Sequence, residues 1–156
     1  MPMTIWVDAD ACPRNVLTLT KERAAQHHLL VITVSNYNHE HQGANHLTVD
    51  AGSQAADMAI VMRMQKGDLV ITQDYGLAAL VLARKGYALS PHGKEYTDDN
   101  IDQLLAMRAV HAKARRSGKR AKIRGPAART QDDDLHFDRS LQVILARMNN
   151  ADMGNV

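Results

Sequence analysis

Hydrophobic residues recur at two different spacings along the chain, and each spacing predicts one kind of element. Short apolar runs rich in β-branched residues are typical of buried strands. Such runs lie at 4–7, 29–34, 46–49, 69–72 and 87–89. Between them, apolar positions recur at intervals of three and four residues, which predicts helices. The predicted helices are one that begins near Pro13, then 54–65, 76–85, one that begins at Thr97 or Asp98, and 134–149.

Strands that alternate with helices indicate an α/β fold with three layers. A connection from strand to helix to strand is right-handed and makes the two strands parallel. We therefore expect a mostly parallel central sheet of about four to five strands, with helices on both faces. Residues 1–150 are expected to form a single domain that includes a basic loop at 113–130 and a C-terminal helix, followed by a tail at 151–156.

Composition narrows the classes of protein to consider. The single cysteine, Cys12, excludes an internal disulfide and a zinc site made of cysteine alone. The longest apolar run, 77–83, has seven residues, whereas a membrane-spanning helix needs about 20. The first residues resemble no signal peptide, so we expect a cytoplasmic protein without a membrane partner.

Charge is divided unevenly between the front and the back of the chain. Residues 1–102 contain eight Lys and Arg against twelve Asp and Glu, whereas 103–156 contain eleven against five. No acidic residue occurs between Gln103 and Gln131. The cations in that window are Arg108, Lys113, Arg115, Arg116, Lys119, Arg120, Lys122, Arg124 and Arg129. This composition predicts a nucleic acid or phosphate partner, with a merely solvated surface as the alternative.

Carboxylates follow the predicted strands at the edge where α/β sheets bind ligands. Asp8 and Asp10 follow the first strand and would point to the same side if the chain stayed extended. Asp74 follows the fourth strand, and Asp50 follows the weak third strand. Asp57 lies in a helix with only apolar residues around it from 55 to 62, which solvation alone does not explain. Any one of these acids could instead be a helix N-cap or a turn residue.

Several carboxylates at one edge would repel one another, and a hard divalent cation would remove that repulsion. Mg²⁺ and Mn²⁺ prefer oxygen ligands and keep some of their waters, which leaves room for a phosphate. Such an ion lowers the pKa of an attacking water and neutralises charge that develops on a phosphodiester. We therefore predict a shared metal and catalytic site made of Asp8, Asp10, Asp57 and Asp74.

Four further residues are candidates for chemistry. Arg108 falls in the apolar stripe that begins at Ile101, where an unpaired charge would be costly. We expect it to pair with a site carboxylate or a phosphate, or to form a simple buried ion pair. His92 and Lys94 follow the fifth strand and either contact phosphate or belong to a structural turn. Cys12 is interpreted as a small packing residue rather than an activated thiol.

Several strings of the sequence resemble the uncharacterised bacterial YaiI/YqxD family. They are Val7-Asp-Ala-Asp-Ala-Cys-Pro13, Gly67-Asp-Leu-Val-Ile-Thr-Gln-Asp74, Ser90-Pro-His-Gly-Lys-Glu-Tyr-Thr97 and Met107-Arg108. The resemblance runs from Thr4 to about Leu145, and the family is similar to the PIN/NYN-like nuclease group. That group places acids after the first strand, in a central helix and after the fourth strand around Mg²⁺ or Mn²⁺. By this resemblance the fold is PIN-like, the three places match Asp8, Asp57 and Asp74, and Asp10 is an added fourth acid.

The leading hypothesis is therefore a metal-dependent nuclease that hydrolyses phosphodiesters of RNA rather than DNA. The residues assigned to the nucleic acid are His92, Lys94, Arg108, Lys113, Arg115, Arg116, Lys119, Arg120, Lys122 and Arg124. One alternative is a non-catalytic RNA-binding or ribosome-associated protein that keeps the fold. Another is a small-molecule phosphohydrolase with Asp8 as nucleophile, although that pattern wants Thr or Val where Cys12 stands. The sequence also allows a homodimer through a sheet edge or the last helix.

Overall fold

A central sheet and its covering helices make up the part of the chain that the computed structural model describes, which is residues 3–36, 45–49, 54–116 and 128–154. The strands are β1 (Thr4–Asp8), β2 (Leu30–Asn36), β3 (His46–Val49), β4 (Leu69–Ile71), β5 (Tyr87–Leu89) and β6 (Glu95–Tyr96). The helices are the short 3₁₀ helix η1 (Ala9–Ala11), α1 (Arg14–Gln26), α2 (Ala55–Arg63), α3 (Tyr75–Ala83), α4 (Ile101–Arg116) and α5 (Gln131–Gly154).

The strands follow the order β3-β2-β1-β4-β5-β6 across the sheet. All neighbouring pairs are parallel except β5 and β6, which are antiparallel. In β1, Val7 is in register with Thr33 of β2 on one side and with Ile71 of β4 on the other. The direction of the chain across the sheet reverses between β1 and β4. Ligands of α/β sheets bind at such a switch point, outside the carboxyl ends of the strands.

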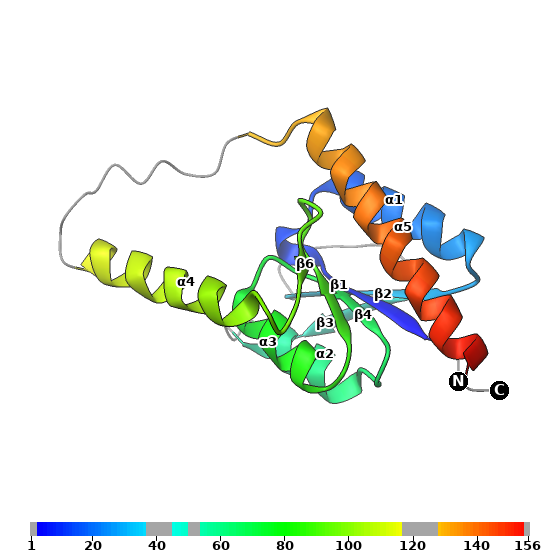
Figure 1. Ribbon diagram of the computed structural model, residues 1–156, viewed down its shortest axis with the longest axis horizontal. Helices are drawn as coiled ribbons and strands as arrows, with labels where there is room; N and C mark the ends of the chain where they lie inside the picture. Colours follow the sequence, from blue (N-terminus) through cyan, green and yellow to red (C-terminus); the bar gives the residue numbers. More distant parts are fainter. Residues whose placement is uncertain (1–2, 37–44, 50–53, 117–127, 155–156) are drawn as a thin grey trace.

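Helices cover both faces of the sheet, so the molecule has three layers (Figure 1). Side chains alternate between the two faces along a strand. Ile5 and Val7 of β1 pack in the core shared with α1 and α5, whereas Trp6 between them packs in the core shared with α2 and α3. These features confirm the predicted fold class, a mostly parallel sheet with helices on both faces.

The last helix, α5, anchors one face of the sheet through a single apolar stripe. Five apolar residues of this stripe recur at helical spacing and are almost fully buried: Phe137, Leu141, Ile144, Leu145 and Met148. Each buried side chain of this size contributes about 1.5–3 kcal/mol. The helix begins earlier than predicted because Thr130 and Asp133 cap it reciprocally. The Thr130 N–H donates to Asp133 Oδ2 at 2.9 Å, and the Asp133 N–H donates to Thr130 Oγ1 at 3.3 Å. It also extends to Gly154, beyond the predicted end at 149.

The residues between β5 and Glu95 form a tight turn that leads into β6, a strand that the sequence analysis did not predict. The backbone N–H of Ser90 donates to the carbonyl of Lys94 at 2.8 Å. Gly93 adopts a φ of +92°, and a Cβ there would lie 2.8 Å from the backbone of His136 in α5. Glycine is therefore required by both conformation and space. A strand of two residues is too short to show a pattern of alternation.

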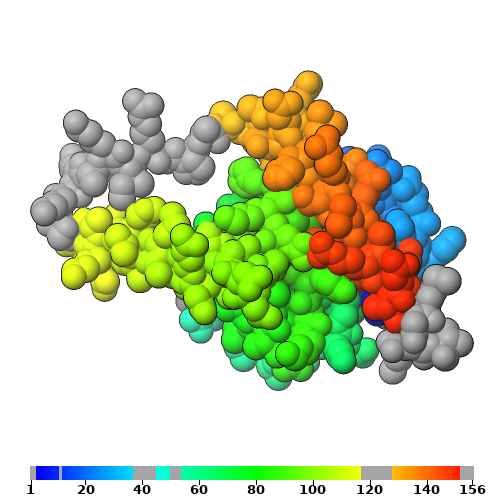
Figure 2. Space-filling view, in the orientation of Figure 1, coloured from blue at the N-terminus to red at the C-terminus, as the bar shows by residue number. Residues whose placement is uncertain are grey.

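Helix α4 leaves the body of the molecule after its first turns. Ile101 and Leu104 are buried, whereas Met107 and Val110 are 48% and 64% exposed. Figure 2 shows the second half of the helix as an arm that stands out from the rest of the described chain. Arg108, in the middle of the helix, is also exposed, so the premise that it lies in a buried apolar stripe is wrong.

Some predicted positions lie outside the described residues. They are Asp50 and the cations Lys119, Arg120, Lys122 and Arg124. Within the described ranges, every helix is either too short or too polar to span a lipid bilayer.

Candidate functional site

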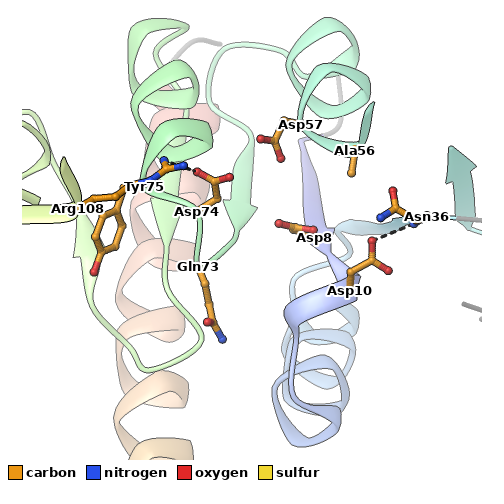
Figure 3. Close-up of a pocket in the computed structure, with 9 residues that line it drawn as sticks. All are labelled: Asp8, Asp10, Asn36, Ala56, Asp57, Gln73, Asp74, Tyr75 and Arg108. Atoms are coloured by element: carbon orange, nitrogen blue, oxygen red, sulfur yellow. Dashed lines mark hydrogen bonds and ion pairs between the residues drawn. The ribbon is translucent and has the colours of Figure 1, made fainter. Parts of the chain in front are cut away.

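A pocket of about 510 Å³ lies at the switch point of the sheet. Asp8 enters it from the end of β1, Asp57 from the first turn of α2 and Asp74 from the N-cap of α3. Figure 3 shows the three carboxylates pointing toward a common space from three separate elements. The remaining lining residues are Asp10, Asn36, Ala56, Gln73, Tyr75 and Arg108. We call this the carboxylate pocket.

Thr72, directly after β4, fixes the two acids that follow the strands. Its hydroxyl donates to Asp8 Oδ2 at 3.0 Å and accepts the backbone N–H of Asp74 at 3.0 Å. Its carbonyl accepts a hydrogen bond from the Tyr96 hydroxyl at 3.2 Å, and the residue is 1% exposed. Thr72 is therefore a positioning residue, and sequence reasoning missed it because its only signal is its place between a strand and Asp74.

Asp74 is both an N-cap and a pocket acid. Its Oδ1 accepts the backbone N–H groups of Gly76 and Leu77 at 2.8 and 3.3 Å, as an N-cap does. The same oxygen lies 3.5 Å from Nη1 of Arg108. A Cβ on Gly76 would lie 3.1 Å from that oxygen and 3.3 Å from the guanidinium nitrogen, so the glycine gives the ion pair its room.

Asp10 reaches the carboxylate pocket by a different route from the one expected. The chain does not stay extended after Asp8 but turns into η1, closed by the Cys12 N–H to the carbonyl of Ala9 at 3.2 Å. The two-residue period of a strand therefore does not apply, and that premise of the prediction is wrong. Asp10 nevertheless lines the pocket, and its Oδ2 accepts the backbone N–H of Asn36 at 2.9 Å.

Burial and mutual repulsion change the acidity of two of the carboxyls. Burial is the largest cause that raises the pKa of Asp57 to about 6, and the negative charges of Asp74 and Asp8 add to it while Arg108 opposes it. Burial also raises the pKa of Asp8, with Asp10 and Asp74 adding repulsion and the hydrogen bond from Thr72 acting in the other direction. The pocket thus concentrates negative charge that a proton or a cation would relieve.

The donor chemistry suits a hard cation, but the acids do not form a closed cage. Among the residues that the structure describes, no three His, Cys, Asp or Glu side chains are arranged to hold a metal ion between them. Carboxylate oxygens are nevertheless the ligands that Mg²⁺ and Mn²⁺ prefer. Mg²⁺ in particular is usually held by one or two carboxylates, with waters and a substrate phosphate completing its shell. The predicted ligand set of four acids stays a prediction.

The cations predicted to bind phosphate are brought to the site only in part. Arg108 lines the carboxylate pocket and pairs with Asp74, as predicted for a site carboxylate, with 57% of its side chain exposed. Lys113, Arg115 and Arg116 are exposed farther along α4. Their contact with nucleic acid stays a prediction.

His92 and Lys94 lie in the turn before β6, against α5. The carbonyl of His92 is 2.9 Å from Nδ1 of His136, and Ser140 Oγ donates to the carbonyl of Gly93 at 2.6 Å. Neither His92 nor Lys94 is among the residues that line the carboxylate pocket. This placement agrees with the alternative that they belong to a structural turn.

Cys12 behaves as a packing residue. It is partly buried against the core formed by β1, α1 and α5. Burial, with repulsion from Asp8 adding to it, raises the pKa of the thiol to about 12. A reactive cysteine needs the opposite shift, so the interpretation of Cys12 as a packing residue is confirmed.

Asn36, Gln73 and Tyr75 also line the carboxylate pocket and were not predicted. Asn36 is the last residue of β2, and the other two flank Asp74 before and in the first turn of α3. The only signal for them in the sequence is that they lie at the end of a strand or where the chain passes from a strand into the next helix.

Comparison with known proteins identifies relatives along nearly the whole chain. A family model described as "Uncharacterized BCR, YaiI/YqxD family" matches residues 6–147. A UPF0178 protein of Exiguobacterium sibiricum is 46% identical, over 92% of this chain and 96% of the relative. A relative from Oceanobacillus iheyensis is 46% identical, over 87% of this chain and 94% of the relative. One from Bacillus cereus is 43% identical, over 93% of this chain and 100% of the relative. No solved structure matches the chain, so the similarity to PIN/NYN-like nucleases stays a prediction. The chain belongs to the YaiI/YqxD family.

Proposed function

We propose that the protein is a metal-dependent hydrolase that cleaves phosphodiester bonds in RNA. The observation that carries the proposal is the meeting of Asp8, Asp57 and Asp74 in one pocket at the switch point of the sheet. Ligands of α/β sheets bind at that point, and carboxylates there suit Mg²⁺ or Mn²⁺. The expected similarity to PIN/NYN-like nucleases assigns the same three acids.

The acids would divide the work according to how each is held. A bound Mg²⁺ or Mn²⁺ supplies a water of lowered pKa and neutralises charge on the phosphodiester. Asp8 and Asp74 would hold the ion, because the hydroxyl of Thr72 and the helix cap already fix their carboxylates. Asp57 faces both across the carboxylate pocket and would accept a proton from the attacking water.

Arg108 would bind the phosphate that is cleaved. Its pairing with Asp74 is long, at 3.5 Å, and exposed. Exposed pairs of this kind are worth about 0–1 kcal/mol, so the guanidinium can exchange a carboxylate for a phosphate at little cost. A guanidinium binds phosphate oxygens in a two-pronged geometry, which would orient the phosphodiester over the acids.

One alternative keeps support from a specific observation. Because no three acidic, histidine or cysteine side chains in the described ranges form a ready metal cluster, a protein that binds RNA without cleaving it would also have this pocket. In that case the exposed cations of α4 would matter, and the carboxylates would not.

The test is calorimetric titration of Mn²⁺ into the wild type and the variants Asp8→Asn and Asp74→Asn, with Asp102→Asn as control. Asp102 is an exposed acid in the first turn of α4 and does not line the carboxylate pocket. The same proteins are then incubated with a labelled single-stranded RNA and Mn²⁺. We expect binding and cleavage in the wild type and the control, and neither in the two pocket variants.

Three outcomes would contradict the proposal. If the wild type does not cleave RNA in the presence of Mn²⁺ or Mg²⁺ but binds it, the non-catalytic alternative is favoured. If cleavage survives in both pocket variants, the acids are not the site. If a phosphate analogue is trapped covalently on Asp8, the small-molecule phosphohydrolase alternative is favoured.

A further inference from the structure

A second hollow opens beside the carboxylate pocket, on the side of α4. It measures about 160 Å³ and is lined by Tyr75, Met107, Arg108, His111 and Arg115. Tyr75 and Arg108 line this hollow and the carboxylate pocket alike, so the two adjoin. We call it the α4 hollow.

The polar residues of the α4 hollow share one face of the helix. Arg108, His111 and Arg115 follow one another at intervals of three and four residues, which places them above one another along a helix. Lys113 and Arg116 are exposed cations of the same helix, but they do not line the hollow. The fold therefore divides the cations of α4 into those that line the hollow and those that do not, a distinction that composition alone could not make.

Tyr75 supplies an aromatic surface where the two hollows meet. Its ring contacts that of Tyr96 edge to face, with centroids 5.8 Å apart and planes at 66°. This contact holds the orientation of the ring. In Figure 3 the ring points away from the three carboxylates, on the side of Arg108. An aromatic ring beside cations is the combination on which proteins stack the bases of a single strand.

A third hollow adjoins the carboxylate pocket on the side of α2 and α3. It measures about 420 Å³ and shares Asp57, Asp74 and Arg108 with the carboxylate pocket. Met58 and Leu80, which are 47% and 45% exposed, add apolar surface to it. Pockets that enclose a whole small ligand measure about 300–1,000 Å³. The α4 hollow is smaller, so it suits one part of a longer ligand that continues past the acids.

We propose that the α4 hollow is a nucleotide subsite for single-stranded nucleic acid. Tyr75 stacks on the base next to the phosphate that Arg108 holds, and Arg115, with His111, contacts the following phosphate. A base in a duplex is covered by its neighbours on both faces, so only an unpaired base can stack on the tyrosine. The position of the cleaved phosphate in this inference rests on the proposed function.

The first test compares two neighbouring arginines. Fluorescence anisotropy measures the binding of a labelled oligoadenylate to Arg115→Ala and Arg116→Ala, in EDTA so that no cleavage occurs. Both substitutions remove one exposed cation from the same helical turn, but only Arg115 lines the hollow. We expect Arg115→Ala to weaken binding about tenfold and to lower the salt dependence by about one phosphate contact. Arg116→Ala should weaken it less than about twofold.

The second test replaces Tyr75 by Leu and by Phe. Loss of stacking in Tyr75→Leu should weaken binding about tenfold, whereas Tyr75→Phe keeps the ring and should bind as the wild type does. Circular dichroism checks that both variants fold, and the arginine pair stands as a test by itself if Tyr75→Leu does not. A fully paired duplex of the same length should bind the wild type more weakly than the single strand.

The outcomes separate this inference from the proposed function. Equal losses in Arg115→Ala and Arg116→Ala, or equal binding of duplex and single strand, would overturn the subsite even if the protein cleaves RNA. Conversely, if the arginines differ as expected but Mn²⁺ brings no cleavage, the subsite stands and the hydrolase proposal fails.

Discussion

The two ends of strand β4 carry acids in opposite circumstances. At its amino end, Asp68 is 3% exposed and accepts hydrogen bonds from the backbone N–H groups of Thr4 and Gln65 and from the indole of Trp6, at 2.9–3.1 Å. At its carboxyl end, the side chain of Asp74 is 36% exposed and faces the acids Asp57 and Asp8.

This difference in neighbours separates an acid that stabilises the fold from acids whose position does not serve stability. Asp68 joins the starts of β1 and β4 and compensates its burial with donors. The acids of the carboxylate pocket repel one another, and an arrangement that costs stability is typical of functional sites. Removing a negative charge should therefore lower the free energy of unfolding at the amino end of β4 and raise it in the carboxylate pocket.

The largest effect is expected at the amino end, from Asp68→Asn. The amide keeps one acceptor oxygen for three donors, so buried N–H groups lose their partners. We expect the free energy of unfolding to fall by about 3 kcal/mol, measured by urea denaturation. A fall smaller than that of the exposed control Asp102→Asn would show that the hydrogen bonds of Asp68 contribute little.

An intermediate effect is expected from Thr72→Val, which keeps the shape but removes the hydroxyl between Asp8 and the N–H of Asp74. The free energy of unfolding should fall by about 1.5 kcal/mol. Because Asp8 then loses its orientation, RNA cleavage should fall further than stability explains. Thr72→Ser restores the hydroxyl and should recover most of the activity. If Val and Ser variants cleave equally well, Thr72 does not position Asp8.

Asp57→Asn in the carboxylate pocket is expected to raise the free energy of unfolding, whereas Asp68→Asn and Thr72→Val lower it. In the wild type the folded protein binds the proton of Asp57 more tightly than the unfolded chain, because its pKa is about 6 when folded and 3.8 ordinarily. Stability is therefore lost as the pH rises from about 4 to about 6. The variant should avoid this loss and be more stable by about 1 kcal/mol at neutral pH, after allowance for solvent screening.

Urea denaturation from acid to neutral pH checks this prediction. The two proteins should be equally stable below about pH 4 and diverge above it. Mn²⁺ should stabilise both proteins at neutral pH, because Asp8 and Asp74 would hold the ion in each of them. A variant that is less stable than the wild type at neutral pH would mean that Asp57 has a favourable partner there.

The smallest effect on stability is expected from Arg108→Ala. An exposed pair contributes little, so the free energy of unfolding should change by less than about 0.5 kcal/mol. RNA binding should nevertheless weaken about tenfold, since the guanidinium borders all three hollows. Anisotropy titrations provide the measurement. If RNA binding is unchanged in Arg108→Ala, Arg108 does not contact the RNA.

The sequence predicts the acids at the carboxyl end better than the acid at the amino end. Asp8 and Asp74 follow apolar runs, and the rule that ligands bind beyond strand ends identifies them directly. Asp57 stands out because it interrupts an apolar helix. Nothing comparable identifies Asp68, because its hydrogen bond to the Trp6 indole joins residues 62 positions apart and depends on the pairing of β1 with β4.

The features that escaped prediction depend on local turns or on tertiary packing. Asp10 was assigned to the pocket through an extended chain, but η1 brings it there instead. The two residues of β6 are too few to show a period. Arg108 has the spacing of a buried position, yet it is exposed, because α4 packs in the core through Ile101 and Leu104 and is mostly exposed from Met107 onward.

The order in which the chain is synthesised gives the position of α5 a consequence for folding in the cell. The helix packs beside α1, and Asp138 binds Arg23 through two hydrogen bonds of 2.7 and 2.8 Å. The part of this face that α5 covers thus stays exposed until α5 has left the ribosome, whereas Ile5 and Val7 are synthesised much earlier. A nascent chain that ends before Phe137 has only α1 to cover this face, and the apolar surface left exposed makes such a species prone to aggregation.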